Sequence, residues 1–148
     1  MSVERNPTPT IQAMLKYAAA YAACAIVMIA LDLVWLGLIA KPLYQQGIGH
    51  LMAERPNLAA AVAFYAIYAL GLTVFAVVAN ADAIGWGKTL GAAALFGLVA
   101  YATYDLSNLA TLKGWPIGVS LIDMVWGSAL STVSAAAGKL ALNRFTSG

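Results

Sequence analysis

Four long apolar stretches limit this chain to the folds that a lipid bilayer permits. They cover about residues 14–40, 58–79, 89–112 and 119–142. A helix needs about 20 residues to cross the hydrocarbon core, so each stretch is long enough for one span. Backbone polar groups in lipid must be bonded within the chain, and strand-like alternation is absent, which leaves helices. We therefore predict an all-α integral membrane protein with four transmembrane helices in an antiparallel bundle.

The composition agrees with lipid as the main solvent of the chain. Of its 148 residues, 62% are hydrophobic and only 9% are charged, whereas a soluble domain has about 25% charged residues. A formal net charge of +2 without a basic run disfavours nucleic acid as a partner. A cleaved signal peptide is also disfavoured, because the first apolar run continues to Ala40 and is too long for a signal core.

The segments outside the apolar stretches are short and polar. We predict a flexible tail at 1–13, one transmembrane domain at 14–142 and a C-terminal tail at 143–148. Five Lys or Arg residues lie with the two ends and the second loop, and three lie in the first and third loops. The side with more positive residues is usually cytoplasmic. This pattern predicts that both termini are cytoplasmic.

The first loop contains a candidate helix that lies in the membrane interface. Tyr44, Ile48, Leu51 and Met52 are spaced at i, i+4, i+7 and i+8, which gives one apolar face. Aromatic residues near the ends of the spans are expected to anchor the chain at the interface. The residues assigned this role are Tyr17, Tyr44, Trp86 and Trp115.

Three aspartates lie within the apolar stretches. Asp32 comes nine residues before Lys41, Asp105 eight before Lys113, and Asp123 ten after Lys113. At 1.5 Å per helical residue, each lies roughly 10–15 Å from the same membrane face. A carboxylate at the bilayer centre costs about 2.5–3.5 kcal/mol on insertion scales. No Lys or Arg occurs at that depth, so the acids should be protonated, bind a cation or be reached by water.

Acids at a matched depth predict one shared interior site. Helical spacing places Gly97, Tyr101, Asp105 and Asn108 on one face of the third span. The predicted binding residues are Asp32, Trp35, Tyr65, Tyr68, Tyr104, Asp105, Asn108, Asp123 and Trp126. Asp32 and Asp105 are the candidates for acid–base or cation-binding roles, with Asp123 in support. The ligand spacing matches no metal motif, so no metal site is predicted, and the sequence assigns no cofactor.

Two tryptophans repeat the same relation to an aspartate. Trp35 follows Asp32 by three residues in DLVW, and Trp126 follows Asp123 by three in DMVW. This echo is consistent with two matching indole–carboxylate pairs, although chance explains it as well. The two helices run antiparallel, so the echo is not a simple structural repeat.

The acids also have structural interpretations. Ser120 and Asp123 have the spacing of a capping box, which would make Asp123 a helix cap. Asp105 would instead bond Ser107, Asn108 or a tyrosine, and Asp32 would bond a neighbouring helix. A stripe of small residues on the fourth span allows another helix to approach closely. It consists of Gly127, Ser131, Ser134 and Gly138.

Four motifs resemble a known family. They are DLVWLG at 32–37, FYAIY at 64–68, YDLSNLATLKGWP at 104–116 and DMVWG at 123–127. Together they resemble the predicted membrane proteins classed as domain of unknown function 2177. The resemblance implies a four-helix protein of the bacterial inner membrane. It implies no activity.

Two classes of function remain open from the sequence. In the first, the acidic site binds or processes a membrane lipid or a small hydrophobic molecule, as an enzyme or as a carrier that uses a carboxylate as a proton relay. In the second, the protein is a non-catalytic subunit or assembly factor, the acids are interhelical hydrogen-bond groups, and the small-residue stripe docks another membrane protein. A homo-oligomer is compatible with both. Ion conduction is less favoured, because the cytoplasmic half offers no continuous polar line.

Overall fold

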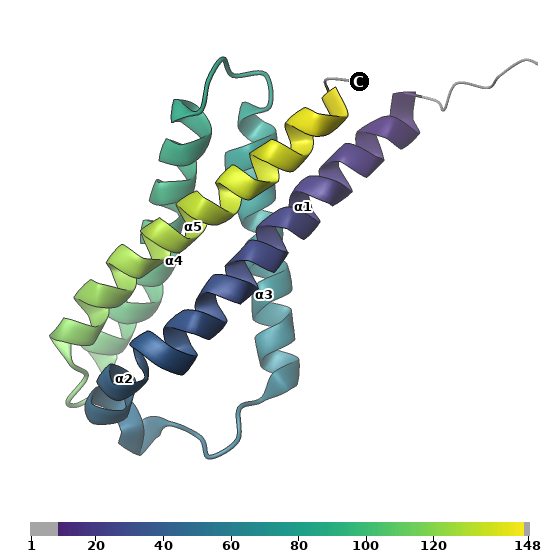
Figure 1. Ribbon diagram of the computed structural model, residues 1–148. Helices are drawn as coiled ribbons and strands as arrows, with labels where there is room; N and C mark the ends of the chain where they lie inside the picture. Colours follow the sequence, from purple (N-terminus) through teal and green to yellow (C-terminus); the bar gives the residue numbers. More distant parts are fainter. Residues whose placement is uncertain (1–8, 147–148) are drawn as a thin grey trace, which may run out of the picture.

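The computed structural model describes residues 9–146 and confirms the predicted fold class. Within that range there is no strand, and four helical segments are long and apolar enough to cross a membrane. These segments are Thr10–Ile39, Leu58–Asn80, Gly87–Thr111 and Ile117–Phe145. Figure 1 shows them as an antiparallel bundle whose described ends meet at the top, with the short helix α2 at the opposite end.

The first span is α1 (Pro9–Val34), which continues into a π-helical turn, η1 (Trp35–Ile39). The helix begins at Pro9, so residues 9–13 are helical and not part of the predicted flexible tail. Proline suits the first turn of a helix, because no N–H is needed there. The rest of that tail, residues 1–8, lies outside the described residues.

The first loop contains the predicted short helix. It is α2 (Lys41–Ile48), followed by a 3₁₀ turn, η2 (Gly49–Leu51). A Cβ on Gly47 would lie 3.0 Å from side-chain atoms of both Pro116 and Val119. Glycine therefore lets α2 pack closely on the start of the last helix. This contact holds α2 across the end of the bundle.

The second span combines three helical forms: α3 (Leu58–Leu72), the π-helical η3 (Thr73–Val77) and the 3₁₀ turn η4 (Val78–Asn80). Asn57 begins it as the N-cap, because its side chain accepts a hydrogen bond from the Ala60 N–H at 3.1 Å.

The third and fourth spans form a helical hairpin, α4 (Gly87–Thr111) and α5 (Ile117–Thr146). Gly114 in the turn has a φ of +72°, a conformation that glycine adopts without strain. The last helix continues beyond the predicted end at 142, so the predicted C-terminal tail is helical through Thr146. Residues 147–148 of that tail lie outside the described part of the chain.

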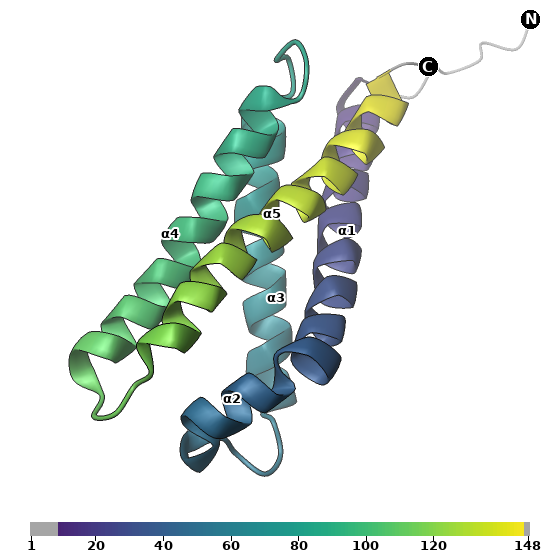
Figure 2. The same cartoon turned by 60° about the vertical axis from the view of Figure 1, so that its left-hand side comes forward.

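Helix α5 is the centre of the bundle, and it packs most extensively against α4 and α1 (Figure 2). The small-residue stripe makes both contacts possible. A Cβ on Gly97 would lie 2.1 Å from the Gly127 carbonyl oxygen, and one on Gly138 would lie 2.4 Å from the Cys24 sulfur. Ser131 is fully buried on the same stripe. The stripe is therefore used inside the chain and offers no docking surface.

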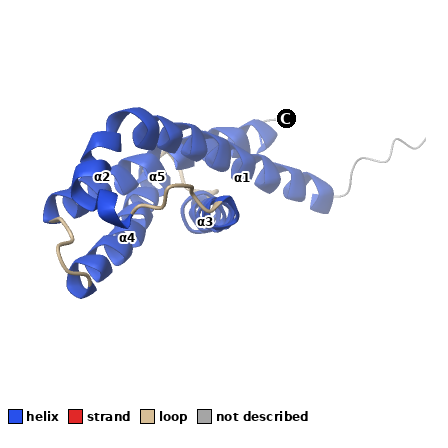
Figure 3. Cartoon of the chain, turned by 90° about the horizontal axis from the view of Figure 1, so that it is seen from below, coloured by secondary structure: helices blue, strands red, loops and turns tan. Residues whose placement is uncertain are grey.

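Helices α3 and α4 separate along their length. α4 packs against η3, near the end that carries the termini, but has few contacts with α3 itself. Toward the α2 end the two helices diverge, and α3 stands apart from α4 when viewed from that end (Figure 3). A pocket of the protein lies between them at this end.

Candidate functional site

The three aspartates of the apolar spans are all buried. Asp32 on α1 is 5% exposed, Asp123 on α5 is 4% exposed, and Asp105 on α4 is fully buried. They come from three different helices that meet around α5. Their burial inside the bundle is costly without partners, so the surroundings of each acid decide what it does.

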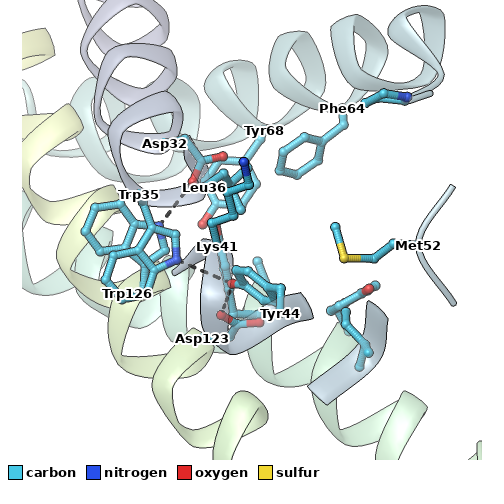
Figure 4. A pocket seen from close by; sticks show the side chains of 15 residues that line it. Asp32, Trp35, Leu36, Lys41, Tyr44, Met52, Phe64, Tyr68, Asp123 and Trp126 are labelled. Atoms are coloured by element: carbon cyan, nitrogen blue, oxygen red, sulfur yellow. Dashed lines mark hydrogen bonds between the residues drawn. The ribbon is translucent and has the colours of Figure 1, made fainter. Parts of the chain in front are cut away.

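Asp32 and Asp123 face a common pocket of about 750 Å³. Its walls are mostly aromatic and come from α1, η1, α2, α3, α4 and α5, together with the loop after η2. Figure 4 shows the two carboxylates one above the other beside a pair of indole rings. Of the predicted binding residues, those that line the pocket are Asp32, Trp35, Tyr68, Tyr104, Asp123 and Trp126.

Asp32 accepts two hydrogen bonds from aromatic side chains. The Tyr65 hydroxyl donates to Oδ2 at 2.6 Å, and the Trp126 indole N–H donates to Oδ1 at 3.1 Å. Tyr65 is thus placed behind the acid and does not line the pocket. These two donors, from α3 and α5, hold the Asp32 carboxylate in one orientation at the pocket wall.

Asp123 accepts a hydrogen bond from the Tyr44 hydroxyl. The Trp35 indole N–H donates to the same hydroxyl oxygen at 3.3 Å. Burial raises the pKa of Tyr44 well above its ordinary value, and the nearby Asp123 carboxylate adds to the rise. Tyr44 therefore remains a donor at physiological pH. The sequence indicated only an interfacial anchor at this position, because the fold of α2 over the pocket leaves no local signal.

The two tryptophans link the carboxylates in a crossed arrangement. Trp35 and Trp126 stack with ring centroids 4.3 Å apart and an interplanar angle of 6°. Trp126 bonds Asp32, the acid of the other helix, and Trp35 reaches Asp123 through Tyr44. Each tryptophan is thus connected to one carboxylate, Trp126 directly and Trp35 through Tyr44. Antiparallel packing brings each indole to the acid of the opposite motif.

Asp105 lies outside the pocket lining. Neither of its carboxylate oxygens has a hydrogen bond of good geometry among the described residues. Ser120 and Trp115 are neighbours of Asp105. The Trp115 N–H, however, donates to the Ser120 hydroxyl at 3.0 Å. Trp115 is only 8% exposed, so it is a buried neighbour of this acid and not the predicted interfacial anchor.

Two further sequence interpretations are settled by these contacts. The capping box is wrong, because α5 begins at Ile117 and places Ser120 and Asp123 inside the helix. The predicted hydrogen bond of Asp105 to Ser107, Asn108 or a tyrosine is also absent, because neither carboxylate oxygen has a partner among the described residues. The Ser107 hydroxyl donates instead to the Tyr104 carbonyl oxygen at 2.9 Å. Asn108, a predicted binding residue, does not line the pocket.

The pocket also has a cationic side chain that the sequence did not predict at this depth. Lys41, at the start of α2, lines the pocket although it is exposed. The short π-helical turn before it, η1, carries the chain from Asp32 around to Lys41 on the same side of the bundle. Among the residues drawn in Figure 4, no hydrogen bond joins Lys41 to either carboxylate.

The acids are too dispersed for a metal centre. Within residues 9–146, no group of three or more His, Cys, Asp or Glu side chains is placed to hold a metal ion. The arrangement has instead two fixed carboxylates, an aromatic wall and a lysine at the rim. Apolar walls with a few fixed polar groups are general features of pockets that hold small organic molecules.

Similarity to known proteins covers most of the chain. A family model described as "Predicted membrane protein (DUF2177)" matches residues 17–140. This range contains all four motifs that resembled the family, and the predicted resemblance is confirmed. No curated protein and no solved structure matches the chain.

Proposed function

The chain belongs to the DUF2177 family of predicted membrane proteins, and from that premise we propose that it binds a membrane-dissolved molecule between Asp32 and Asp123. The observation that carries the proposal is the pocket itself. Two buried carboxylates from different helices face one cavity of about 750 Å³ with aromatic walls. We place the protein in the bacterial inner membrane with both termini in the cytoplasm.

The size and lining of the pocket suit an organic ligand. Pockets that bind small molecules and cofactors occupy about 300–1,000 Å³ and combine apolar walls with a few polar groups. Acids that served only to join helices would not need a cavity in front of them. A carboxylate has about four acceptor sites. Asp32 uses two of them and Asp123 one, so both retain capacity for a ligand.

The position of the pocket favours entry from the bilayer. The side chains at its edge are exposed where α3 and α4 diverge: Phe64 by 45% and Tyr104 by 56%. Leu36 on η1 is 44% exposed at the same pocket. In a membrane these surfaces face lipid, because they lie within or beside the spanning segments. A ligand dissolved in the bilayer can therefore reach the acids without crossing water.

Each polar residue has a defined part in this proposal. Asp32 and Asp123 contact the ligand, while Tyr44, Tyr65 and Trp126 fix the carboxylates in place. Asp32 is the candidate acid–base group if the bound molecule is also processed. Asp105, the other sequence candidate, does not line the pocket and takes no part in this proposal. The subunit alternative loses its proposed docking stripe, which is buried within the chain.

Native mass spectrometry in mild detergent tests the proposal. The wild-type protein should carry a bound lipid or small molecule that Asp32→Asn and Asp123→Asn each reduce by about tenfold, the effect of one lost charge-assisted contact. Asp82→Asn is the matched control, since Asp82 is exposed in the turn before α4. An unliganded wild-type protein, or equal occupancy in all four proteins, would contradict the proposal.

A further inference from the structure

We propose that the ligand is a phospholipid whose head group carries both an ammonium and a phosphate, with the ammonium between Asp32 and Asp123 and the phosphate at Lys41. The inference rests on the proposed function and adds the chemical class of the ligand. Three properties of the pocket carry it: the direction of its hydrogen bonds, its aromatic walls and the charge at its rim.

The hydrogen-bond donors around Asp32 and Asp123 are already used by the carboxylates or by each other. Tyr65 and Trp126 donate to Asp32, Tyr44 donates to Asp123, and Trp35 donates to Tyr44. None of these four donors is left for an anion deep in the pocket. The carboxylates keep unused acceptor sites, which an ammonium with several N–H groups satisfies. The inner end of the pocket therefore selects a cation with hydrogen-bond donors.

The walls around the acids also favour a cation. The Trp35 and Trp126 rings stack at 4.3 Å, and Tyr68 and Tyr101 line the same pocket. Aromatic faces attract an organic cation within about 6 Å, most strongly when water is excluded. The Tyr68 hydroxyl is paired with Ser131 at 2.8 Å, so this ring offers mainly its face. Carboxylates and aromatic rings together form a site for an alkylammonium.

The rim carries the opposite charge. Lys41 lines the pocket from the first turn of α2, is exposed, and has no hydrogen bond to the carboxylates in Figure 4. An ammonium side chain offers three donors to a phosphate. Lys41 lies just after the end of the first span, next to the level of the lipid head groups. The pocket thus presents negative charge inside and positive charge at its mouth, complementary to a zwitterionic head.

The lateral opening explains why the ligand is a lipid and not a free head group. α3 and α4 diverge at the pocket, and the partly exposed rings of Phe64 and Tyr104 flank it. Acyl chains attached to a head group at the acids can pass between these helices into the bilayer. A soluble phosphate ester would leave this apolar edge uncovered.

The test uses the full-length protein in nanodiscs that contain equal amounts of phosphatidylethanolamine and phosphatidylglycerol with the same acyl chains. After transfer to mild detergent, native mass spectrometry counts the lipid retained. We expect phosphatidylethanolamine to exceed phosphatidylglycerol by about tenfold, which corresponds to one additional charge-assisted contact. Asp32→Asn should reduce this preference, because the two lipids share the phosphate and differ in the ammonium. Lys41→Gln should lower the retention of both lipids, whereas Lys88→Gln, which changes an exposed lysine at the opposite end, should leave both unchanged.

The outcomes separate the inference from the proposed function. Equal retention of the two lipids, or a preference for phosphatidylglycerol, would overturn the inference while leaving a lipid in the pocket. Retention of neither lipid would also overturn the inference, and a purified wild-type protein that in addition carries no ligand of its own would overturn the proposed function itself. Displacement of the lipid by millimolar phosphoethanolamine would show that the free head group suffices, and would refute the lipid part of the inference.

Discussion

Gly97→Ala should weaken the contact between α4 and α5 more than any exposed glycine substitution. The added Cβ would lie 2.1 Å from the Gly127 carbonyl oxygen and 2.5 Å from the Ser131 hydroxyl. An ordinary contact begins at 3.4 Å, so the helices would have to separate by about 1.3 Å at this point. Two of the blocking atoms are backbone, which cannot rotate away.

The expected cost is at the upper end of the range for overpacking, about 3 kcal/mol. For a chain of this size, that corresponds to a melting temperature roughly 6–12 °C lower. The assay is thermal unfolding in mild detergent, followed by tryptophan fluorescence. Gly91→Ala is the control on the same helix, because its Cβ would meet nothing within 4 Å. Alanine is the better helix former by about 1 kcal/mol, so this variant should be at least as stable as the wild type.

A Gly97→Ala protein with the same melting temperature as Gly91→Ala would refute the reasoning. It would mean that α4 and α5 are not packed backbone to backbone at Gly97.

Three further substitutions test individual contacts by the same melting assay. Tyr65→Phe removes the 2.6 Å hydrogen bond to Asp32 and should cost about 1–3 kcal/mol, so an unchanged melting temperature would contradict that bond. Asp105→Asn should melt no lower than the wild type, because both oxygens of this buried acid lack a partner of good geometry in the described chain. A large fall in melting temperature would mean that Asp105 is hydrogen-bonded. Gly138→Ala should destabilise through the Cys24 sulfur, 2.4 Å from the new Cβ, and Cys24→Ala in the same protein should recover part of the loss; no recovery would place the clash elsewhere.

The sequence predicted the burial of the three acids but not their division of roles. The depth of a residue along its helix follows from the residue count and the rise per residue, so the burial of the acids could be predicted. Which way a side chain points depends on the rotation of its helix against its neighbours. Asp105 turns toward Trp115 and Ser120, while Asp32 and Asp123 turn toward the pocket. Single-helix spacing does not contain that rotation.

The residues that sequence reasoning missed come from the first loop. Tyr44 and Lys41 belong to a short helix that folds across the end of the bundle, and its contacts reach residues about 70–80 positions away. A local pattern indicated a helix there but not its direction. The small residue Gly47, which lets α2 approach the start of α5, was the available signal.

The sequence by itself determined the class of fold and the positions of the spans. Lipid removes water as a hydrogen-bond partner, so long apolar stretches must be helices, and their lengths must match the bilayer. The tertiary structure alone decided the site. It crossed the Trp35 and Trp126 contacts, carried α2 over the acids and left α3 and α4 apart at one end. Those arrangements depend on the close packing of α1, α4 and η3 around α5, where a single methyl group at Gly97 or Gly138 would not fit.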